Sequence, residues 1–361
     1  RDAYPAVISQ QSSGATSFQA AGSLATGLPP VTFPDLNTGK LVFPAGLGTT
    51  TYPTEIHRGY IETYNLTIQR QLPWNINFQT GYVGTHSIRQ FAHVNINVAP
   101  PGGGNAALPL NKLWGNTSSI VVVEPFNSSR YNSIQTQVVK RIRGPSQVRL
   151  TYTFGKAIDY SDNSDSSLSW PLPSIQYRNK AVAGYDRTHN LKIFGTYELP
   201  FGRGHRWLTH GAGRAIAGGW QVNGIFGIVS GSPFTVGSSA TSLNAPGNSQ
   251  TADQVSTDVA IFGGLTPYFD TKAFAGVTAV RFGNTGRNIL RGPGYKNLDA
   301  SVFRTFAVRE RIRLQFRAEA FNAANHPRFG NPAATVTSGG FGNITSASNE
   351  RQMRFAMKLI W

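Results

Sequence analysis

The side chains best suited to catalysis or metal binding are scattered along this sequence. Cysteine is absent, which removes disulfides, thiolate metal sites and cysteine nucleophiles, and no G-x-S-x-G turn presents a serine. Seven histidines occur, and no pair has the HExxH spacing of zinc enzymes or a comparable ligand spacing: His57, His86, His93, His189, His205, His210 and His326. The pattern therefore predicts no enzyme and no cofactor, and a metal site only if loops assemble one.

Two short stretches have residues that could bind ions. The stretch DYSDNSD (159–165) carries an aspartate at every third position, whereas a calcium loop of the EF-hand type needs oxygen ligands at every second position and a glycine at the sixth. A solvated extracellular loop is the alternative. The stretch GRGHRW (202–207) has glycines and bases suited to phosphate, but it lacks the GKS/T ending of a P-loop. We therefore interpret it as a turn.

The charge is strongly positive. Lys and Arg number 33 against 17 Asp and Glu, a net charge of +16, and such a surface attracts nucleic acid, anionic lipid or acidic polysaccharide. The 39 glycines and 21 prolines favour a turn-rich β protein. No apolar run reaches the roughly 18 residues of a transmembrane helix, but a transmembrane β-barrel needs only alternating strands of about 9–11 residues. Composition leaves that architecture open.

The stretch RQMRFAMKLIW (351–361) alternates between an apolar and a polar face. Such alternation is typical of a half-buried β-strand, and eight further segments show it. We therefore predict an all-β fold, an antiparallel up-and-down meander of about nine or more strands. The predicted strands are 60–70, 74–85, 130–142, 146–157, 188–199, 219–230, 296–306, 311–322 and 351–361.

The connections between these segments are short and long in turn. Three are tight turns: 71–73, 143–145 and 307–310. Four are long and rich in Gly, Asn, Ser and Pro: 86–129, 158–187, 231–295 and 323–350. A further connection, 199–218, stands where a short turn is expected. Outer-membrane barrels have short periplasmic turns and long extracellular loops, so we predict the strands of a transmembrane β-barrel over 59–361, preceded by an extracellular loop region over 1–58.

This orientation places five aromatic residues at the periplasmic ends of their strands, on the apolar face: Trp74, Tyr197, Trp220, Phe306 and Trp361. Amphipathic rings suit the headgroup region, so we predict a periplasmic aromatic girdle. A soluble β-sandwich, the alternative fold, has no reason to place five aromatic residues at one level.

Arg304 also falls on the apolar face, where a charge at mid-bilayer costs about 2–4 kcal/mol. Either it snorkels to the nearby interface, or the strand has a bulge or a slip of its alternation there.

Four stretches, together and in this order, resemble the C-terminal barrel of TonB-dependent outer-membrane transporters of the Oar-like branch. They are DRTHNLKIFGTYELPFGRG (186–204), NLDASVFRTFAV (297–308), LQFRAEAFNAANHPRFGNP (314–332) and RQMRFAMKLIW. The resemblance extends from about Tyr60 to Trp361. It implies a location in the bacterial cell outer membrane, in contact with membrane lipid and lipopolysaccharide, and no nucleic-acid partner.

The resemblance also implies a role for the terminal strand. The barrel-assembly machinery reads alternate hydrophobic residues and a final aromatic as an insertion signal, and the matching positions are Phe355, Met357, Leu359 and Trp361. The plainer interpretation, compatible with this one, is that they are ordinary lipid-facing residues.

The family has parts that this chain does not show: a carboxypeptidase-regulatory-like domain, a plug and a TonB box. Its complete barrels have about 22 strands, and single-chain bacterial barrels have even strand counts. We therefore expect the chain to be the last nine strands of a longer barrel. The strands at 60–70 and 351–361 would then be unpaired edges that the rest of the barrel covers.

Six basic residues fall on the polar alternation and would line the lumen: Arg149, Arg311, Arg313, Arg317, Arg354 and Lys358. They could complement an acidic plug or attract an anionic substrate. The alternative is that the rest of the barrel balances their charge.

The leading functional hypothesis is uptake of an unidentified substrate by a TonB-dependent transporter, with the loops 86–129 and 231–295 as the best candidates for recognition. The first alternative is an outer-membrane barrel for adhesion or surface organisation without active transport. The second is a soluble basic β protein that binds nucleic acid or polysaccharide.

Overall fold

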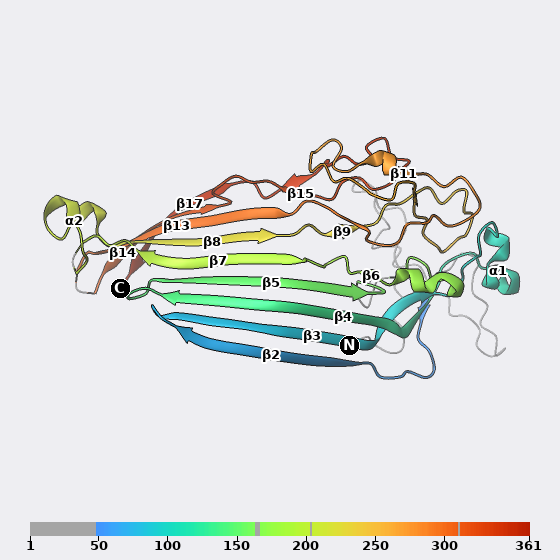
Figure 1. Cartoon of the computed structure of the whole chain (residues 1–361), viewed down its shortest axis with the longest axis horizontal. Helices are drawn as coiled ribbons and strands as arrows, with labels where there is room; N and C mark the ends of the chain where they lie inside the picture. Colours follow the sequence, from blue (N-terminus) through green and yellow to red (C-terminus); the bar gives the residue numbers. More distant parts are fainter. Residues whose placement is uncertain (1–47, 163–166, 203, 310) are drawn as a thin grey trace, which may run out of the picture.

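The computed structural model describes residues 48–162, 167–202, 204–309 and 311–361. In this part, nine long strands form one antiparallel sheet (Figure 1). They are β2 (Tyr60–Leu72), β3 (Ile76–Asn95), β4 (Ile120–Arg141), β5 (Gln147–Asp159), β7 (His189–Glu198), β8 (Trp220–Val229), β13 (Tyr295–Ala307), β14 (Arg313–Phe321) and β17 (Gln352–Ile360). Each long strand pairs with the next one along the chain, which confirms the predicted meander. β2 and β17 are the free edges, so the sheet is not closed.

Shorter elements lie in the connections. β1 (Thr49–Thr51) pairs in parallel with β4, and β6 (Ala181–Val182) pairs with β5. Three small ladders join β9 (Pro233–Phe234) to β12 (Leu290–Arg291), β10 (Asp253–Gln254) to β11 (Phe274–Ala275), and β15 (Arg328–Phe329) to β16 (Ala347–Ser348). The helices are η2 (Asn105–Ala107), α1 (Pro109–Trp114), η3 (Pro173–Asn179), α2 (Gly211–Ala217) and η4 (Thr271–Ala273). Within the residues that the structure describes, no helix combines the length and hydropathy needed to cross a membrane.

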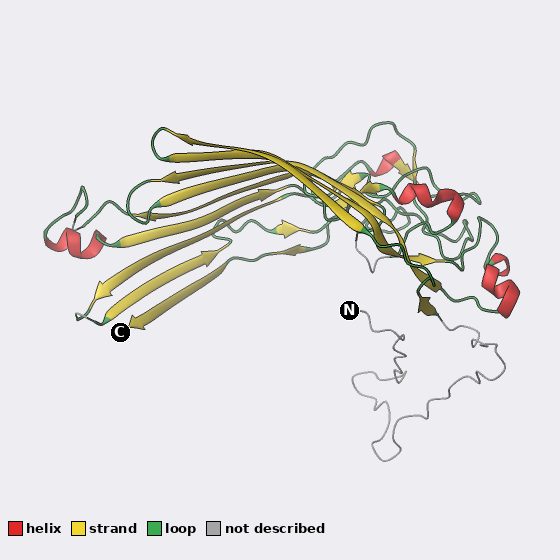
Figure 2. Cartoon of the chain, turned by 90° about the horizontal axis from the view of Figure 1, so that it is seen from below, coloured by secondary structure: helices red, strands yellow, loops and turns green. Residues whose placement is uncertain are grey.

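The connections separate to opposite ends of the sheet. In Figure 1 the short turns and α2 lie at the left end, beside the C-terminus, and the long connections gather at the right end. Figure 2 shows that the sheet is curved. We call these ends the turn end and the loop end. The predicted separation of short turns from long loops is thus present in the fold.

The predicted loop 86–129 is wrong at both ends. β3 continues to Asn95 and β4 begins at Ile120, so the connection is only 96–119. The β3–β4 pairing has register shifts between Ser87 and Gln90 and between Gln90 and Ala92. Bulges of this kind break the two-residue period, so alternation could not follow the strands through them.

Other boundaries differ less. The seven remaining long strands begin and end within two residues of the predicted positions. Trp74 lies in the turn before β3 with a φ of 62°, and Arg311 lies in the turn before β14. The alternation of apolar and polar residues predicts both of them in strands, because this alternation continues into the tight turns. In the predicted loop region 1–58, residues 1–47 lie outside the described part, and β1 forms a short strand.

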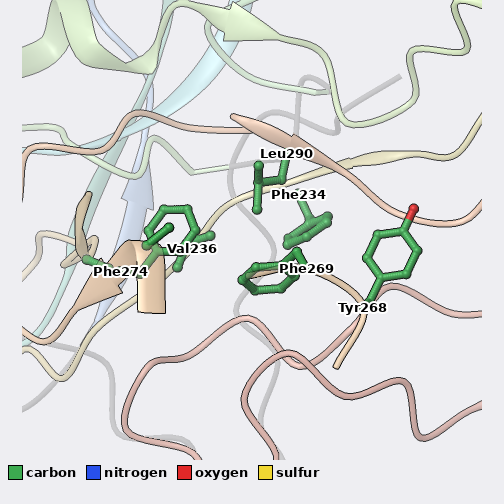
Figure 3. Packing of buried hydrophobic residues seen from close by; sticks show 8 residues of the cluster. Phe234, Val236, Tyr268, Phe269, Phe274 and Leu290 are labelled. Carbon is green, nitrogen blue, oxygen red and sulfur yellow. The ribbon is translucent and has the colours of Figure 1, made fainter. Parts of the chain in front are cut away.

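The long connections have a hydrophobic core of their own (Figure 3). Phe269 is completely buried at its centre, with the ring of Phe274 edge-on at 5.8 Å and that of Phe341 edge-on at 5.3 Å. Edge-to-face rings at such distances add stability beyond burial. Phe341 belongs to the connection between β14 and β17, and the other two rings belong to the connection between β8 and β13. The core therefore joins two loops that are distant in sequence.

Backbone hydrogen bonds join a third loop to this layer. In the β3–β4 connection, the N–H of Ala99 donates to Pro246 at 3.1 Å and the N–H of Gly102 donates to Leu243 at 2.8 Å. Inside this connection, the Asn97 side chain spans the loop by donating to the carbonyls of Asn116 and Ser118. The two loops predicted as best for recognition, 86–129 and 231–295, thus form one folded layer at the loop end.

The loop core yields a stability prediction. Phe269→Ala removes a fully buried ring and should cost the loop layer about 3–5 kcal/mol, while Phe262→Ala, in the same connection but 60% exposed, should cost little. Limited proteolysis of the membrane-inserted protein measures this opening. We expect faster cleavage within 231–295 for Phe269→Ala only. Equal cleavage of the two variants would contradict the proposed core.

Candidate functional site

The strand register gathers apolar side chains of all nine strands on one face of the sheet. Directly opposite residues in an antiparallel sheet point to the same side, and Leu66, Tyr82, Ile134 and Phe154 follow one another across four strands. These side chains are 40–70% exposed. The face continues through Leu191, Ile193, Phe226, Val302, Ala318, Phe355 and Met357. An exposed apolar face suits contact with lipid, whereas a soluble sandwich would have covered it.

The opposite face is polar and hydrogen-bonded along its rows. Gln69, Gln79 and Gln137 are neighbours across β2, β3 and β4, and the first two share a hydrogen bond of 2.9 Å. Near the middle of the sheet, Thr196 donates to Asn223 at 3.0 Å, and Asn223 in turn donates to Ser301 at 3.3 Å. Uncharged side chains able to donate and accept therefore dominate this face. Such a surface suits a water-filled lumen.

Arginines of the polar face lie over aromatic rings. The guanidinium carbon lies 5.4 Å from the ring centre of Phe194 for Arg149, 4.8 Å from that of Phe303 for Arg317, and 5.1 Å from that of Phe321 for Arg354. These cation–π contacts orient the cations.

The remaining predicted lumen-facing bases lie nearer the turn end. Arg313 opens β14 opposite Ala307, and Lys358 pairs with Gln315. Arg311 precedes the strand and is exposed in the turn. The register thus brings Arg149, Arg313, Arg317, Arg354 and Lys358 to one face, and it does not include Arg311.

The five predicted girdle residues all lie at the turn end. Tyr197, Trp220 and Phe306 lie on the apolar face, near the ends of β7, β8 and β13. Trp74 lies in the β2–β3 turn and Trp361 follows β17, and these two are 81% and 88% exposed. Their common level agrees with the predicted girdle, whose interfacial role stays a prediction.

Arg304 lies on the apolar face without a bulge. Its strand pairs continuously with β14 on both sides of this residue and with β8 up to it, which rules out the alternatives of a bulge and a slipped register. The guanidinium donates to the carbonyl of Ile216 at 2.6 Å and to that of Ala215, both at the end of α2. Its carbon lies 4.4 Å from the ring centre of Phe306. The side chain therefore reaches toward the turn end, in agreement with the snorkelling alternative.

At the loop end, a polar hollow of about 320 Å³ opens between three connections and the start of β13. Arg187 and Arg328 contribute its charge, and the Arg328 guanidinium lies 4.6 Å from the ring centre of Tyr295, a polar-face residue. Apart from Pro293 and Phe329, the rest of the lining is small or polar, including Ser230, Ser232, Asn331, Ser346 and Ser348. We call it the arginine hollow. It offers cations and hydrogen-bonding groups, the chemistry that binds an oxyanion.

The electrostatics of the arginine hollow are those of crowded positive charge. Burial lowers the pKa of the Arg187 guanidinium, and the nearby positive charge of Arg328 lowers it further. Arg291 adds a third positive charge that acts in the same direction, although its own partner is Asp186. A bound anion would relieve the repulsion between these guanidinium groups.

Asp186 anchors the loop layer to the sheet beside this hollow. Its side chain is almost completely buried, accepts the N–H of Ala157 in β5 at 2.6 Å, and forms an ion pair with Arg291. Across the sheet, the N–H of Asn322 donates to Asp299 at 2.8 Å, and the Asn322 amide bonds His326. Both anchors lie where a strand meets a loop.

The two stretches that were considered for ion binding have structural contacts. Asp159 and Asp162 both lie against the Arg287 guanidinium, at 3.4 Å for Asp162, and Asp165 lies outside the described residues. In GRGHRW, the N–H of Gly202 donates to Trp207 and closes a turn, with Arg203 outside the described part. In the described ranges, no group of three or more His, Asp or Glu side chains could hold a metal ion.

Sequence reasoning missed the arginine hollow because its residues come from separate loops. Arg187 and Arg328 do lie inside two of the quoted stretches, DRTHN and NHPRFGNP. Their position in those stretches was the one sign of a role. The two arginines are more than a hundred residues apart in the sequence, so the sequence could not indicate that they line one hollow.

The sequence matches the model of a family described as outer membrane beta barrel domain over residues 1–354. No curated protein matches it. Among solved structures, it is similar to the outer membrane transporter YddB from Escherichia coli, with 8% identity over 88% of this chain and 34% of that one and a TM-score of 0.48.

A second similar structure is the pyoverdine outer membrane receptor FpvA from Pseudomonas aeruginosa, with 10% identity over 83% of this chain and 29% of that one and a TM-score of 0.42. A third is the ferric citrate transporter FecA, with 11% identity over 83% and 31% of the two chains and a TM-score of 0.40. The chain spans about a third of the length of these solved proteins.

The anchor at Asp186 can be tested against a matched ion pair. Asp186→Asn leaves the partly buried Arg291 without its counter-charge and should destabilise the loop end by about 2–3 kcal/mol. In the control, Asp253→Asn, the partner is the exposed Arg281, whose hydrogen bond holds the Asp253 pKa below its usual range. That change should matter little, because water screens the pair. Hydrogen–deuterium exchange of residues 180–188 reports the opening, and equal exchange in both variants would refute the anchor.

Proposed function

The chain belongs to the outer membrane beta barrel domain family, and from this premise we propose that it forms part of the wall of a TonB-dependent transporter that takes up an anionic substrate. It is a protein of the bacterial outer membrane. The observation that carries the proposal is the arginine hollow, which lies at the loop end beside the polar face of the sheet. A ligand that binds there from outside the cell would then move directly along the polar face of the sheet.

The polar face supports passage and the packing of a plug. Its uncharged rows are polar surfaces suited to contact with water, and its bases, which include the five predicted ones, present a positive field to whatever fills the lumen. The free edges of β2 and β17 leave backbone groups that further strands would have to pair in a membrane. A longer barrel enclosing an acidic plug, with TonB as the energy-coupling partner, satisfies both requirements.

Two further roles are part of the proposal. Phe355, Met357, Leu359 and Trp361 are exposed at the last strand, which suits recognition by the barrel-assembly machinery. The aromatic residues at the turn end suit the headgroup region of the periplasmic leaflet, and the loop end would face the lipopolysaccharide side.

Family membership leaves the soluble nucleic-acid-binding alternative without support. An adhesion barrel without transport is the competing outcome of the experiment below.

Energy coupling is testable with a defined partner. We expect the full-length gene product, purified in detergent, to bind the periplasmic C-terminal domain of TonB in a pull-down. Binding should disappear when the segment before the barrel is deleted, because we expect the coupling element to lie there and not in the barrel wall. A full-length protein in outer membrane that fails to bind TonB would favour the adhesion alternative.

The substrate class is testable at the arginine hollow with inorganic pyrophosphate as the probe. Calorimetry of the detergent-solubilised protein should show an affinity at least about a hundredfold weaker for Arg187→Gln with Arg328→Gln, since two hydrogen bonds to charged groups are lost and each contributes about 1.5–3 kcal/mol. Arg309→Gln, an exposed base at the turn end, is the control and should bind as the parent does. Unchanged affinity in the double variant would refute an anionic substrate at this hollow.

A further inference from the structure

The connection between β7 and β8 differs from the other connections at the turn end. It runs from residue 199 to 219, contains α2, and has no Asp or Glu. The described turns between β2 and β3 and between β4 and β5 span only a few residues. The basic residues of this connection are Arg203, His205, Arg206, His210 and Arg214. We call it the basic connection.

The basic connection is held against the apolar side of the sheet. Arg304 and Trp220, both on the apolar face, donate to the carbonyl of Ile216 at 2.6 Å and 2.9 Å. Arg304 also bonds the carbonyl of Ala215. These bonds satisfy carbonyls at the end of α2 that have no partner within the helix. The connection is thereby fixed at the level of the aromatic residues, where the lipid-facing surface meets water.

A hollow of about 480 Å³ lies between this connection and the end of β13. Its lining includes His205, Arg214 and Arg304, together with Thr305 and the rings of Phe201 and Phe306. The five ion pairs found in the described part of the chain all involve other residues. The guanidinium groups of Arg214 and Arg304 therefore face this hollow without a carboxylate partner among the described residues.

Apolar side chains stand exposed around the same connection. Trp207, Leu208 and Ile216 are 51%, 49% and 72% exposed, and they extend the level of Trp220 and Phe306. Exposed apolar residues beside bases that have no carboxylate partner are typical of elements that lie in the membrane interface. A polar anion would be satisfied by the bases alone, but it would leave these apolar residues in water.

We propose that the hollow binds the phosphate of an anionic phospholipid in the periplasmic leaflet, and that the exposed apolar residues contact its acyl chains. Arginine suits this role because its planar guanidinium can donate two hydrogen bonds to one phosphate. The absence of acidic residues in the connection favours an anionic headgroup over a zwitterionic one. The inference rests on the membrane orientation of the proposed function, but not on its substrate or on TonB.

Native mass spectrometry of the detergent-solubilised full chain tests this site. We expect it to retain dioleoyl phosphatidylglycerol in preference to dioleoyl phosphatidylcholine. His205→Gln with Arg214→Gln should lower the retained phosphatidylglycerol at least about tenfold, since the loss of one hydrogen bond from a charged donor alone contributes a factor of this order. These two side chains make no side-chain bond among the described residues, so the fold should persist. Arg141→Gln, a base that ends β4 on the polar face at the same end, is the control and should retain lipid as the parent does.

A second variant separates a lipid from a free anion. Ile216→Asn removes an exposed apolar contact and leaves every base in place, so it should also weaken retention of phosphatidylglycerol, and inorganic phosphate in excess should not displace the lipid. Displacement by phosphate alone would identify a simple anion site. Equal retention of the two lipids, or retention unchanged in the double variant, would also overturn the proposal. None of these outcomes depends on pyrophosphate binding or on TonB.

Discussion

The structure depends on one constraint: a backbone that crosses a membrane must satisfy all its hydrogen bonds internally. The ladder that runs from β2 to β17 meets this constraint between neighbouring strands, while the free edges of β2 and β17 leave backbone groups that further strands would have to pair. Once the register is set, every side chain is assigned to one of two faces. The lipid-facing surface, the polar lining and the aromatic level at the turn end all follow from that register, and a shift of one residue in any strand would exchange its two faces.

The two ends of the sheet differ in how the chain is held in place. In the proposed orientation, the chain reverses within the headgroup region at the turn end, and aromatic rings with Arg304 lie at the boundary between hydrocarbon and water. At the loop end it holds long segments in a fixed arrangement, which the proposed orientation puts outside the membrane. It does so with the Phe269 core and with buried carboxylates such as Asp186, which bind both strand backbone and loop arginines. Positive charge is therefore available at both ends, for different partners.

Segments within two of the stretches of family resemblance lie at junctions between strands and loops. DRTHN contains Asp186, whose carboxylate links β5 to Arg291, and His189, whose ring nitrogen lies 2.8 Å from the Tyr152 hydroxyl. NLDASVF and NAANHP supply the Asp299–Asn322 contact. These residues connect regular strands to irregular loops, where alternation no longer decides the conformation and specific hydrogen bonds must do so.

The sequence alone determined the nine strands, their up-and-down order and their two faces. It also determined that the short turns lie together at one end of the sheet. It could do so because alternation and turn residues are local properties, read within about ten residues. Tertiary structure decided the bulged extensions of β3 and β4, because a bulge breaks the very period that reveals a strand. It also decided the loop core, the contact of Arg304 with α2, and the meeting of Arg187 with Arg328. Each of these joins residues far apart in the chain, and their positions follow only from the packing of several loops at once.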